Sequence, residues 1–210
     1  MSTASPPSRS GRAALLDAAR RVVQREAAAV AALEQQLDEG FVVACELVLS
    51  CRGRVVCAGV GKSGIVARKL AASFASLGTP ALFVHAAEAL HGDLGMITGS
   101  DVVVLFSHSG TTPEVLAMLP SLARMAVPVI AVTDDRASPL AAAAAVTVDP
   151  GCREEADHLG LAPTASTTAA LVLADALAVA VAQVSGFTAE DFARTHPGGA
   201  LGTALAEEVP

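Results

Sequence analysis

The chain has 210 residues, of which 52% are hydrophobic and 17% charged, and its formal net charge is −7. This size suits one α/β domain with a large core, and the acidic balance excludes the basic surface that nucleic-acid binding requires. The longest apolar stretch, Ala169–Val184, is interrupted by Asp175, so it predicts a buried helix and not a membrane span. We therefore expect a cytoplasmic protein with neither membrane nor nucleic acid as partner.

The N-terminal segment Met1–Gly11 is rich in Ser and Pro and lacks the apolar core of a signal peptide. We expect a disordered tail over residues 1–11 and one domain over residues 12–205. Apolar residues at three- and four-residue steps then predict a long amphipathic helix that packs on the sheet, pairs with another subunit, or does both. These residues are Leu16, Ala19, Val23, Val30, Leu33 and Leu37. A shorter helix is predicted over Phe41–Ser50.

Strands and helices alternate through the rest of the chain. The predicted strands are Arg54–Ala58, Ala81–Val84, Asp101–Phe106, Pro128–Val132 and Val146–Val148. The predicted helices are Ser63–Leu77, Ala86–His91, Pro113–Met125, Pro139–Ala144 and Thr164–Gln183. Short apolar strands separated by helices indicate a parallel sheet that is covered on both faces. Ligands bind such sheets at the carboxyl ends of the strands.

One strand end is built to hold a phosphate. The apolar run Val102–Phe106 leads directly into Ser107-His108-Ser109-Gly110-Thr111-Thr112-Pro113-Glu114, where hydroxyls, backbone N–H groups and a helix N-terminus converge. A second hydroxyl cluster, Thr164–Thr168, opens the long late helix. Each cluster alone could equally be an ordinary helix cap. Together with a glycine loop at another strand end, they favour a common anion site.

The glycine loop Gly59–Gly64 follows the first strand. A Walker A loop would need glycine where Val56 stands, so that interpretation fails. The spacing also fits a dinucleotide loop, but the next strand ends at His85 without the acidic residue that such a site needs. Lys62 lies inside the loop and is one of only two lysines beside twelve arginines. It indicates a need for a compact ammonium group; the alternative is a solvated surface lysine.

Histidines and carboxylates supply candidate acid–base groups. His91 and His196 lie in polar, glycine-rich segments that do not suggest a core histidine. Glu114 lies in the first turn of a predicted helix, where the helix dipole alone would explain a carboxylate. Glu155 precedes the Thr164–Thr168 cluster, where a bound anion would raise its pKa and suit it to act as a general base. The cysteine and histidine spacings match no standard zinc set, so no metal is predicted.

Five motifs occur in an order that is similar to one family. They are Gly59-Val60-Gly61-Lys62-Ser63-Gly64, His91-Gly92-Asp93-Leu94-Gly95-Met96, Ser107-x-Ser109-Gly110, Leu159-Gly160-Leu161-Ala162-Pro163-Thr164 and His196-Pro197-Gly198-Gly199-Ala200-Leu201-Gly202. Over roughly Ala13–Leu205 the chain resembles the sugar isomerase (SIS) domain of the D-arabinose 5-phosphate isomerases. The resemblance implies an SIS-type three-layer αβα sandwich around a five-stranded parallel sheet.

The resemblance also implies an activity. The family interconverts D-ribulose 5-phosphate and D-arabinose 5-phosphate without a cofactor, through a cis-enediol(ate), as the first step towards Kdo for lipopolysaccharide or capsule. Its members are tetramers whose active sites are shared between subunits. The catalytic positions carried over are Lys62, His91, Glu114, Glu155 and His196. The phosphate-binding positions are Ser107, Ser109 and Thr112, with Ser63, Ser166 and Thr167 assisting.

Two features depart from the family pattern. Its usual members append a pair of CBS modules after the HPGGALG segment, whereas eight residues follow Gly202 here; we therefore expect no CBS domains. His108 and Thr111 stand where Asn and Glu are common, which leaves the selectivity among sugar phosphates open. The alternatives are an isomerase of another sugar phosphate, such as a heptose or hexulose phosphate, and a non-catalytic sugar-phosphate sensor.

Overall fold

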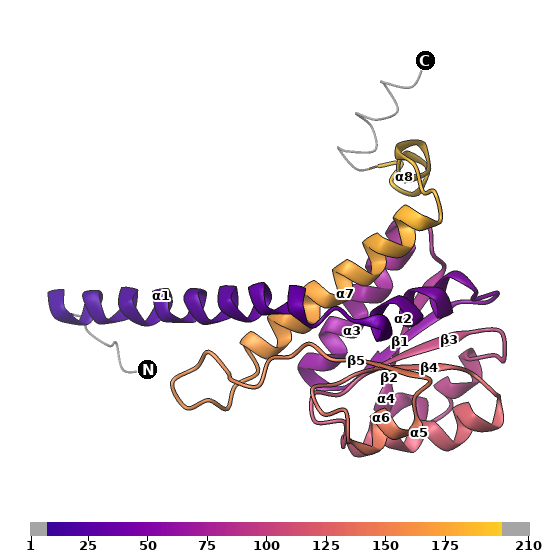
Figure 1. Cartoon of the computed structure of the whole chain (residues 1–210), viewed down its shortest axis with the longest axis horizontal. Coiled ribbons are helices and arrows are strands. Elements are labelled where there is room, and N and C mark those ends of the chain that lie inside the picture. The colour runs from indigo at the N-terminus through magenta and orange to yellow at the C-terminus, as the bar shows by residue number, and fades with distance from the viewer. Residues whose placement is uncertain (1–7, 199–210) are drawn as a thin grey trace, which may run out of the picture.

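A computed structural model describes residues 8–198. They form three layers, with one sheet between two layers of helices (Figure 1). The five strands all pair in parallel, in the order β2-β1-β3-β4-β5. Each lies within one residue of its predicted ends: β1 Val55–Gly59, β2 Ala81–His85, β3 Val102–Phe106, β4 Val129–Val132 and β5 Val146–Val148. The predicted α/β sandwich with a five-stranded parallel sheet is confirmed.

Helices cover both faces of the sheet (Figure 1). One face carries α2 (Glu39–Leu49), α3 (Gly61–Ser76) and α7 (Ala165–Val184), with α1 (Arg9–Ala32) packed on α7. The opposite face carries α4 (Ala86–Ala89), α5 (Pro113–Arg124) and α6 (Pro139–Ala143). This arrangement leaves the carboxyl ends of the strands and the N-termini of the following helices at one edge of the sheet.

The strands are apolar throughout because both of their faces are covered. Along β1, Val55 and Cys57 pack in the core beneath α3 and α7, whereas Val56 and Ala58 pack in the core beneath α5. All four are fully buried. Side chains alternate between the faces of a strand, and a strand covered on both faces therefore lacks an alternating polar pattern.

Helix α7 is the long late helix predicted from Thr164 to Gln183. By length and composition it could cross a membrane, but half of the tested window is buried inside the fold. Its buried residues include Ala169, Leu173, Leu177 and Val181, which share one face at four-residue steps. That face packs on the neighbouring helices and shares one core with Val55 and Cys57 of β1, which accounts for its apolar composition.

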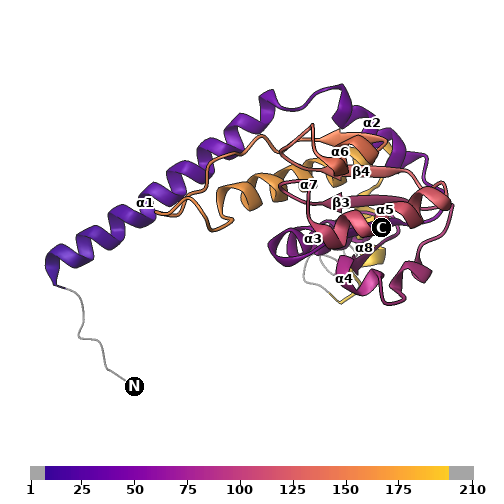
Figure 2. The ribbon, with the colours of Figure 1, turned by 90° about the horizontal axis from the view of Figure 1, so that it is seen from below.

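Helix α1 begins at Arg9, earlier than predicted, so residues 9–11 of the expected tail are helical. Residues 1–7 of that tail and residues 199–205 of the expected domain lie outside the described part of the chain. The C-terminal half of α1 packs near α7, and the remainder extends away from the body of the domain (Figure 2). Of the predicted apolar stripe, Leu33 is buried, whereas Leu16 and Val23 are 58% and 67% exposed. The stripe therefore has no complete partner surface within the described residues of one chain.

Polar contacts fix the junction between α1 and α7. The Thr168 hydroxyl donates to Glu26 Oε2 at 3.1 Å, and the Arg25 guanidinium donates to the carbonyl oxygen of Glu155 at 3.2 Å. Glu26, which interrupts the predicted stripe, is thus the residue that anchors α1 to the first turns of α7.

Three short helical elements differ from the prediction. The helix predicted over Ala86–His91 ends at Ala89, and a 3₁₀ turn follows over Asp93–Met96. A last helix, α8 (Ala189–Thr195), starts at a capping box in which Thr188 and Asp191 bond each other's backbone N–H groups. Its signal, threonine followed three residues later by aspartate, is visible in the sequence.

Candidate active site

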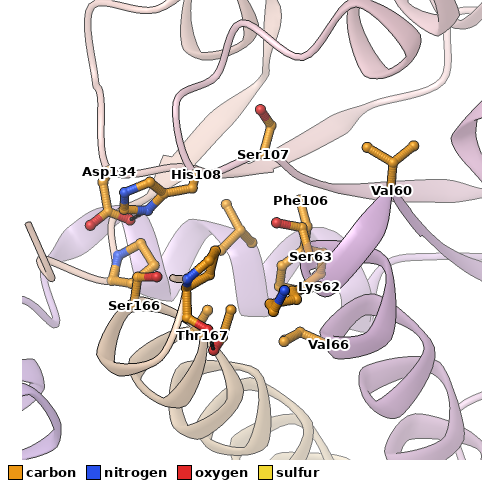
Figure 3. Close-up of a pocket in the computed structure, with 14 residues that line it drawn as sticks. Val60, Lys62, Ser63, Val66, Phe106, Ser107, His108, Asp134, Ser166 and Thr167 are labelled. Atoms are coloured by element: carbon orange, nitrogen blue, oxygen red, sulfur yellow. Dashed lines mark hydrogen bonds and ion pairs between the residues drawn. The ribbon is translucent and has the colours of Figure 1, made fainter. Parts of the chain in front are cut away.

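One cavity lies at the point where the order of the strands reverses. From β1 the chain moves outward to β2 and then returns to β3, so the connections leave β1 and β3 on opposite sides. Parallel sheets bind ligands at such a switch point. A cavity of about 180 Å³ opens there, lined by the residues after β1, β3 and β4 and by the first turns of α3 and α7 (Figure 3).

The glycine loop brings α3 close to β3. Gly61 has a φ of +56°, a conformation that glycine adopts without strain. A Cβ at Gly59 would lie 3.1 Å from the Gly64 nitrogen and 3.2 Å from the Phe106 carbonyl oxygen, so any larger residue would crowd both backbones. Lys62 and Ser63 thereby line the cavity from the N-terminus of α3.

The hydroxyl loop forms the wall beside β3. Ser107 is buried and lines the cavity, and its Oγ lies 2.7 Å from Thr112 Oγ1. Ser109 Oγ lies 2.8 Å from Thr111 Oγ1 on the same loop. The hydroxyls are therefore paired along a turn that ends at the N-terminus of α5.

Replacing Gly110 with alanine is expected to displace this loop. Gly110 has a φ of +64°, and a Cβ there would lie 2.0 Å from Ser138 Oγ and 2.3 Å from Ser138 Cβ. Strain and overlap together should lower the free energy of unfolding by about 2–3 kcal/mol, which a thermal melt would detect. Gly95→Ala is the control, because nothing lies within 4 Å of its Cβ position. Equal stability of the two variants would contradict this account of the loop.

Glu155 caps the N-terminus of α7. Its Oε2 accepts hydrogen bonds from the Thr164 nitrogen at 2.7 Å and the Ser166 nitrogen at 3.3 Å. The Thr164 hydroxyl donates to the same oxygen at 3.1 Å, and the Ser166 hydroxyl donates to Oε1. The carboxylate thus neutralises orphan donors at the positive end of the helix dipole.

These contacts set the ionisation of Glu155. Burial alone would raise its pKa, but the hydrogen bonds from Ser166 and Thr164 outweigh burial and hold the pKa below its ordinary value. The expectation of a raised pKa concerns a state with an anion bound nearby, and it stays a prediction for that state. Fewer free donors also remain on α7, since Ser166 bonds Glu155 and the Thr167 hydroxyl donates to the Thr164 carbonyl oxygen at 2.9 Å.

The lowered pKa of Glu155 predicts a pH-dependent contribution to stability. A depressed carboxyl pKa stabilises the fold above the unfolded value of about 4.3, and this stability is lost as the pH falls through the folded pKa. Glu155→Gln should therefore be less stable than the parent chain by about 1 kcal/mol at pH 7. The difference should be smaller at pH 3, because protonation of Glu155 is then closer. Denaturant unfolding at both pH values measures it, and a gap that does not change with pH would contradict the capping role.

The structure gathers part of the predicted site at the cavity. Five predicted residues line it: Lys62, Ser63, Ser107, Ser166 and Thr167. Glu155 contacts the lining residue Ser166. Ser109 and Thr112 lie on the hydroxyl loop that Ser107 begins. These eight residues share one edge of the sheet although they span more than a hundred positions in the sequence.

Two predicted catalytic residues lie towards the opposite face. Glu114 is in the first turn of α5. His91 is exposed on the turn after α4, where its backbone N–H donates to the Glu88 carbonyl oxygen at 2.9 Å. Helices α4 and α5 pack against each other, so both residues flank the loops at the carboxyl ends of β2 and β3. Neither residue lines the cavity.

His196 lies far from the cavity of its own chain. Its Nε2 is 2.9 Å from Ser76 Oγ, and its ring stacks on Phe192 with centroids 3.9 Å apart. Ser76 is the last residue of the 16-residue helix α3, whose first turn lines the cavity about 20 Å away. One chain therefore does not bring His196 together with Lys62.

Asp134 was missed, and His108 was noted only as a departure from the family pattern. Both line the cavity, and His108 Nδ1 lies 3.2 Å from Asp134 Oδ1. Asp134 comes two residues after the end of β4, so the rule that ligands meet strand ends could have identified it. Neither the sequence spacing nor the motif resemblance points to the pair.

Comparisons with known proteins agree with this architecture. The SIS domain family profile matches residues 48–180, which lie inside the predicted domain. The arabinose 5-phosphate isomerase KdsD of Pseudomonas aeruginosa is 52% identical over 194 residues, which cover 92% of this chain and 60% of that protein. KdsD of Escherichia coli K12 is 52% identical over 188 residues, covering 90% and 57%. The chain thus spans about 60% of the length of these curated relatives.

Among solved structures, c3406 of E. coli CFT073, in complex with arabinose 5-phosphate, superposes with a TM-score of 0.85 at 45% identity. The match covers 88% of this chain and 98% of that one. The family profile covers more than half of the chain, including the loops that line the cavity. The chain belongs to the SIS domain family.

Proposed function

We propose that the chain is an aldose–ketose isomerase that interconverts D-ribulose 5-phosphate and D-arabinose 5-phosphate. The observation that carries the proposal is the cavity at the switch point, where Lys62 and buried hydroxyls meet the N-termini of two helices. Such a set of donors suits a dianionic phosphate ester. The names of the KdsD relatives and the arabinose 5-phosphate bound to c3406 support this choice of sugar phosphate.

The phosphate group is the anchor of the substrate. We assign its binding to Ser107 and Lys62, with Ser63 on the adjacent turn of α3 and Ser109 and Thr112 on the hydroxyl loop. Binding a non-reacting phosphate holds the sugar in place, so that C1 and C2 meet the catalytic groups in a fixed geometry.

The reaction moves one proton between C2 and C1. A base removes the C2 proton of the open-chain aldose while O1 gains a proton, which gives the cis-enediol; O2 then loses its proton as C1 gains one, which gives the ketose. Glu155 is proposed as the base, and Lys62 would stabilise negative charge on the enediolate oxygens. As the base, Glu155 would exchange a contact with Ser166 for the substrate when the sugar binds.

His91 and His196 are proposed to open the sugar ring and shuttle protons, with Glu114 orienting one of them. Because His196 lies at the far end of α3, it would serve the cavity of another copy of the chain. The exposed apolar side chains of α1, including Leu15 and Leu16, offer a surface for that association. We propose a homotetramer that works in the cytoplasm at the first step of Kdo synthesis.

A panel of sugar phosphates tests the assigned substrate. The purified chain is incubated with ribulose 5-phosphate, hexulose phosphates and a heptose phosphate, and the isomerised product of each is quantified. The proposal predicts that ribulose 5-phosphate has the highest kcat/KM. A higher kcat/KM for a six- or seven-carbon sugar phosphate would show that the assigned substrate is wrong. Binding without turnover would indicate a sugar-phosphate sensor.

Mixing two inactive variants tests the sharing of sites between subunits. Lys62→Met and His196→Ala are each expected to lose activity. When they are unfolded together and refolded, a site that takes Lys62 from one parent and His196 from the other should be active again. Recovery of activity in the mixture supports the shared site, and continued inactivity of a properly assembled mixture contradicts it.

A further inference from the structure

We propose that His108, held by Asp134, is a further substrate-binding residue whose imidazolium contacts the anionic phosphate of the sugar. This inference rests on the proposed function, since it takes the cavity to be the sugar-phosphate site. It adds a cationic group to a cradle that otherwise consists of Lys62, hydroxyls and backbone N–H groups.

The backbone around His108 is locked in place. The His108 carbonyl oxygen accepts hydrogen bonds from the Asp134 nitrogen and from Thr133 Oγ1, both at 3.0 Å. The Asp134 carboxylate is buried, and its Oδ2 accepts a hydrogen bond from the Cys152 nitrogen at 2.9 Å. The ring is therefore positioned by residues that lie within two positions of the ends of β3 and β4.

The two ring nitrogens of His108 face different partners. Nδ1 lies 3.2 Å from Asp134 Oδ1, and a carboxylate at that position favours a protonated Nδ1. Nε2 lies on the other side of the ring and is left to meet a ligand. Figure 3 shows His108 and Asp134 on one side of the cavity, with Lys62 and Ser63 on the other. An anion between them would meet a cation from each side.

The charge of the cavity depends on His108. Among the described lining residues, Lys62 and Asp134 carry opposite fixed charges, so a neutral His108 leaves the lining without net charge. Glu155 adds a negative charge behind Ser166, and the exposed Arg153 guanidinium adds a positive one nearby. A dianionic ligand therefore gains most from a protonated His108.

The imidazolium is favoured by its surroundings. The hydrogen bond to Asp134 raises the pKa of His108 above its ordinary value against the opposing effect of burial. The charges of Asp134 and Glu155 act in the same direction as this bond, whereas Arg153 acts against it. A histidine with a raised pKa is charged at lower pH and loses the charge as the pH rises through the folded value, so anion affinity should fall as the pH rises.

Binding of inorganic sulfate to the full chain tests the inference, measured by calorimetry at pH 6.5 and pH 9. Sulfate stays a dianion over this range, so a change in affinity reports on the protein. The parent chain should bind sulfate about tenfold more weakly at pH 9. His108→Gln should bind at pH 6.5 as weakly as the parent chain does at pH 9, and its affinity should change far less with pH. In steady-state kinetics near pH 7, it should raise KM more than it lowers kcat.

Asp134→Asn is the companion variant. It keeps the size of the side chain but removes the charge, so the loss of sulfate affinity should begin at lower pH than in the parent chain. If the buried amide of this variant prevents folding, the half-exposed His108 still allows the glutamine variant to decide the matter. Sulfate affinity that does not differ between His108→Gln and the parent chain overturns the inference, as does a loss of kcat with unchanged sulfate binding. Because sulfate binding needs no turnover, failure of the isomerase assay alone leaves this inference intact.

Discussion

Replacing Glu155 with glutamine is expected to lower kcat by about a thousandfold. A positioned general base contributes roughly 10²–10⁴-fold to proton transfer, and an amide of the same shape cannot accept the proton. The variant should still bind arabinose 5-phosphate, because Lys62 and Ser107 are unchanged. Exchange of the C2 hydrogen of arabinose 5-phosphate with solvent deuterium should stop.

Glu154→Gln provides the matched control. Glu154 is the neighbouring carboxylate, but it is exposed, and the hydrogen bond that it accepts from the Cys152 thiol goes to its backbone oxygen. The control variant should retain the activity of the parent chain. If Glu155→Gln continues to exchange the C2 hydrogen at the normal rate, Glu155 is a helix cap alone, and the base must be sought elsewhere in the site.

Replacing Lys62 with methionine is expected to lower kcat/KM by about a hundredfold. The substitution keeps the apolar stem of the side chain while removing a charge at the mouth of the cavity. Loss of a charge-assisted hydrogen bond to phosphate weakens binding, and loss of the charge near the developing enediolate slows the reaction. Steady-state kinetics with arabinose 5-phosphate separates the two effects in KM and kcat.

Lys69→Met is the control for Lys62. Lys69 lies seven residues further along α3, about two turns away and on a similar face, and its ammonium group bonds Asp175. Its replacement should change stability slightly, since the pair is partly exposed, and leave kcat/KM near that of the parent chain. If the two substitutions lower kcat/KM equally, Lys62 is an ordinary surface lysine.

The sheet could be predicted because its signals are local and strong. Runs such as Val102–Phe106 are apolar at every position, which suits strands covered on both faces, and a helix pattern follows each of them except the last, which a loop separates from α7. The outward end of α1 could not be predicted, because a hydrophobic stripe does not reveal whether its partner surface lies in the same chain. The short α8 was missed although its capping box is visible in the sequence.

The residue types of the candidate site could be predicted from the sequence, but the relative positions of several of them could not. Ser107 follows β3 directly and Lys62 comes three residues after the neighbouring strand β1, so the sheet brings the two residues together. The distance of His196 from the cavity depends on how α8 packs at the end of α3, which no local pattern encodes. The hydrogen bonds that lower the pKa of Glu155 likewise come from a helix start nine and eleven residues later in the chain. The pairing of His108 with Asp134 joins two strand ends and requires the strand order.

The most direct test of the proposed activity follows arabinose 5-phosphate in deuterated water by proton NMR with the purified full chain. We expect the C2 proton signal to disappear while the ribulose 5-phosphate signals grow towards equilibrium, and we expect neither change with Glu155→Gln. An unchanged C2 signal with the folded parent chain, under conditions where the sugar phosphate demonstrably binds, would contradict the isomerase assignment.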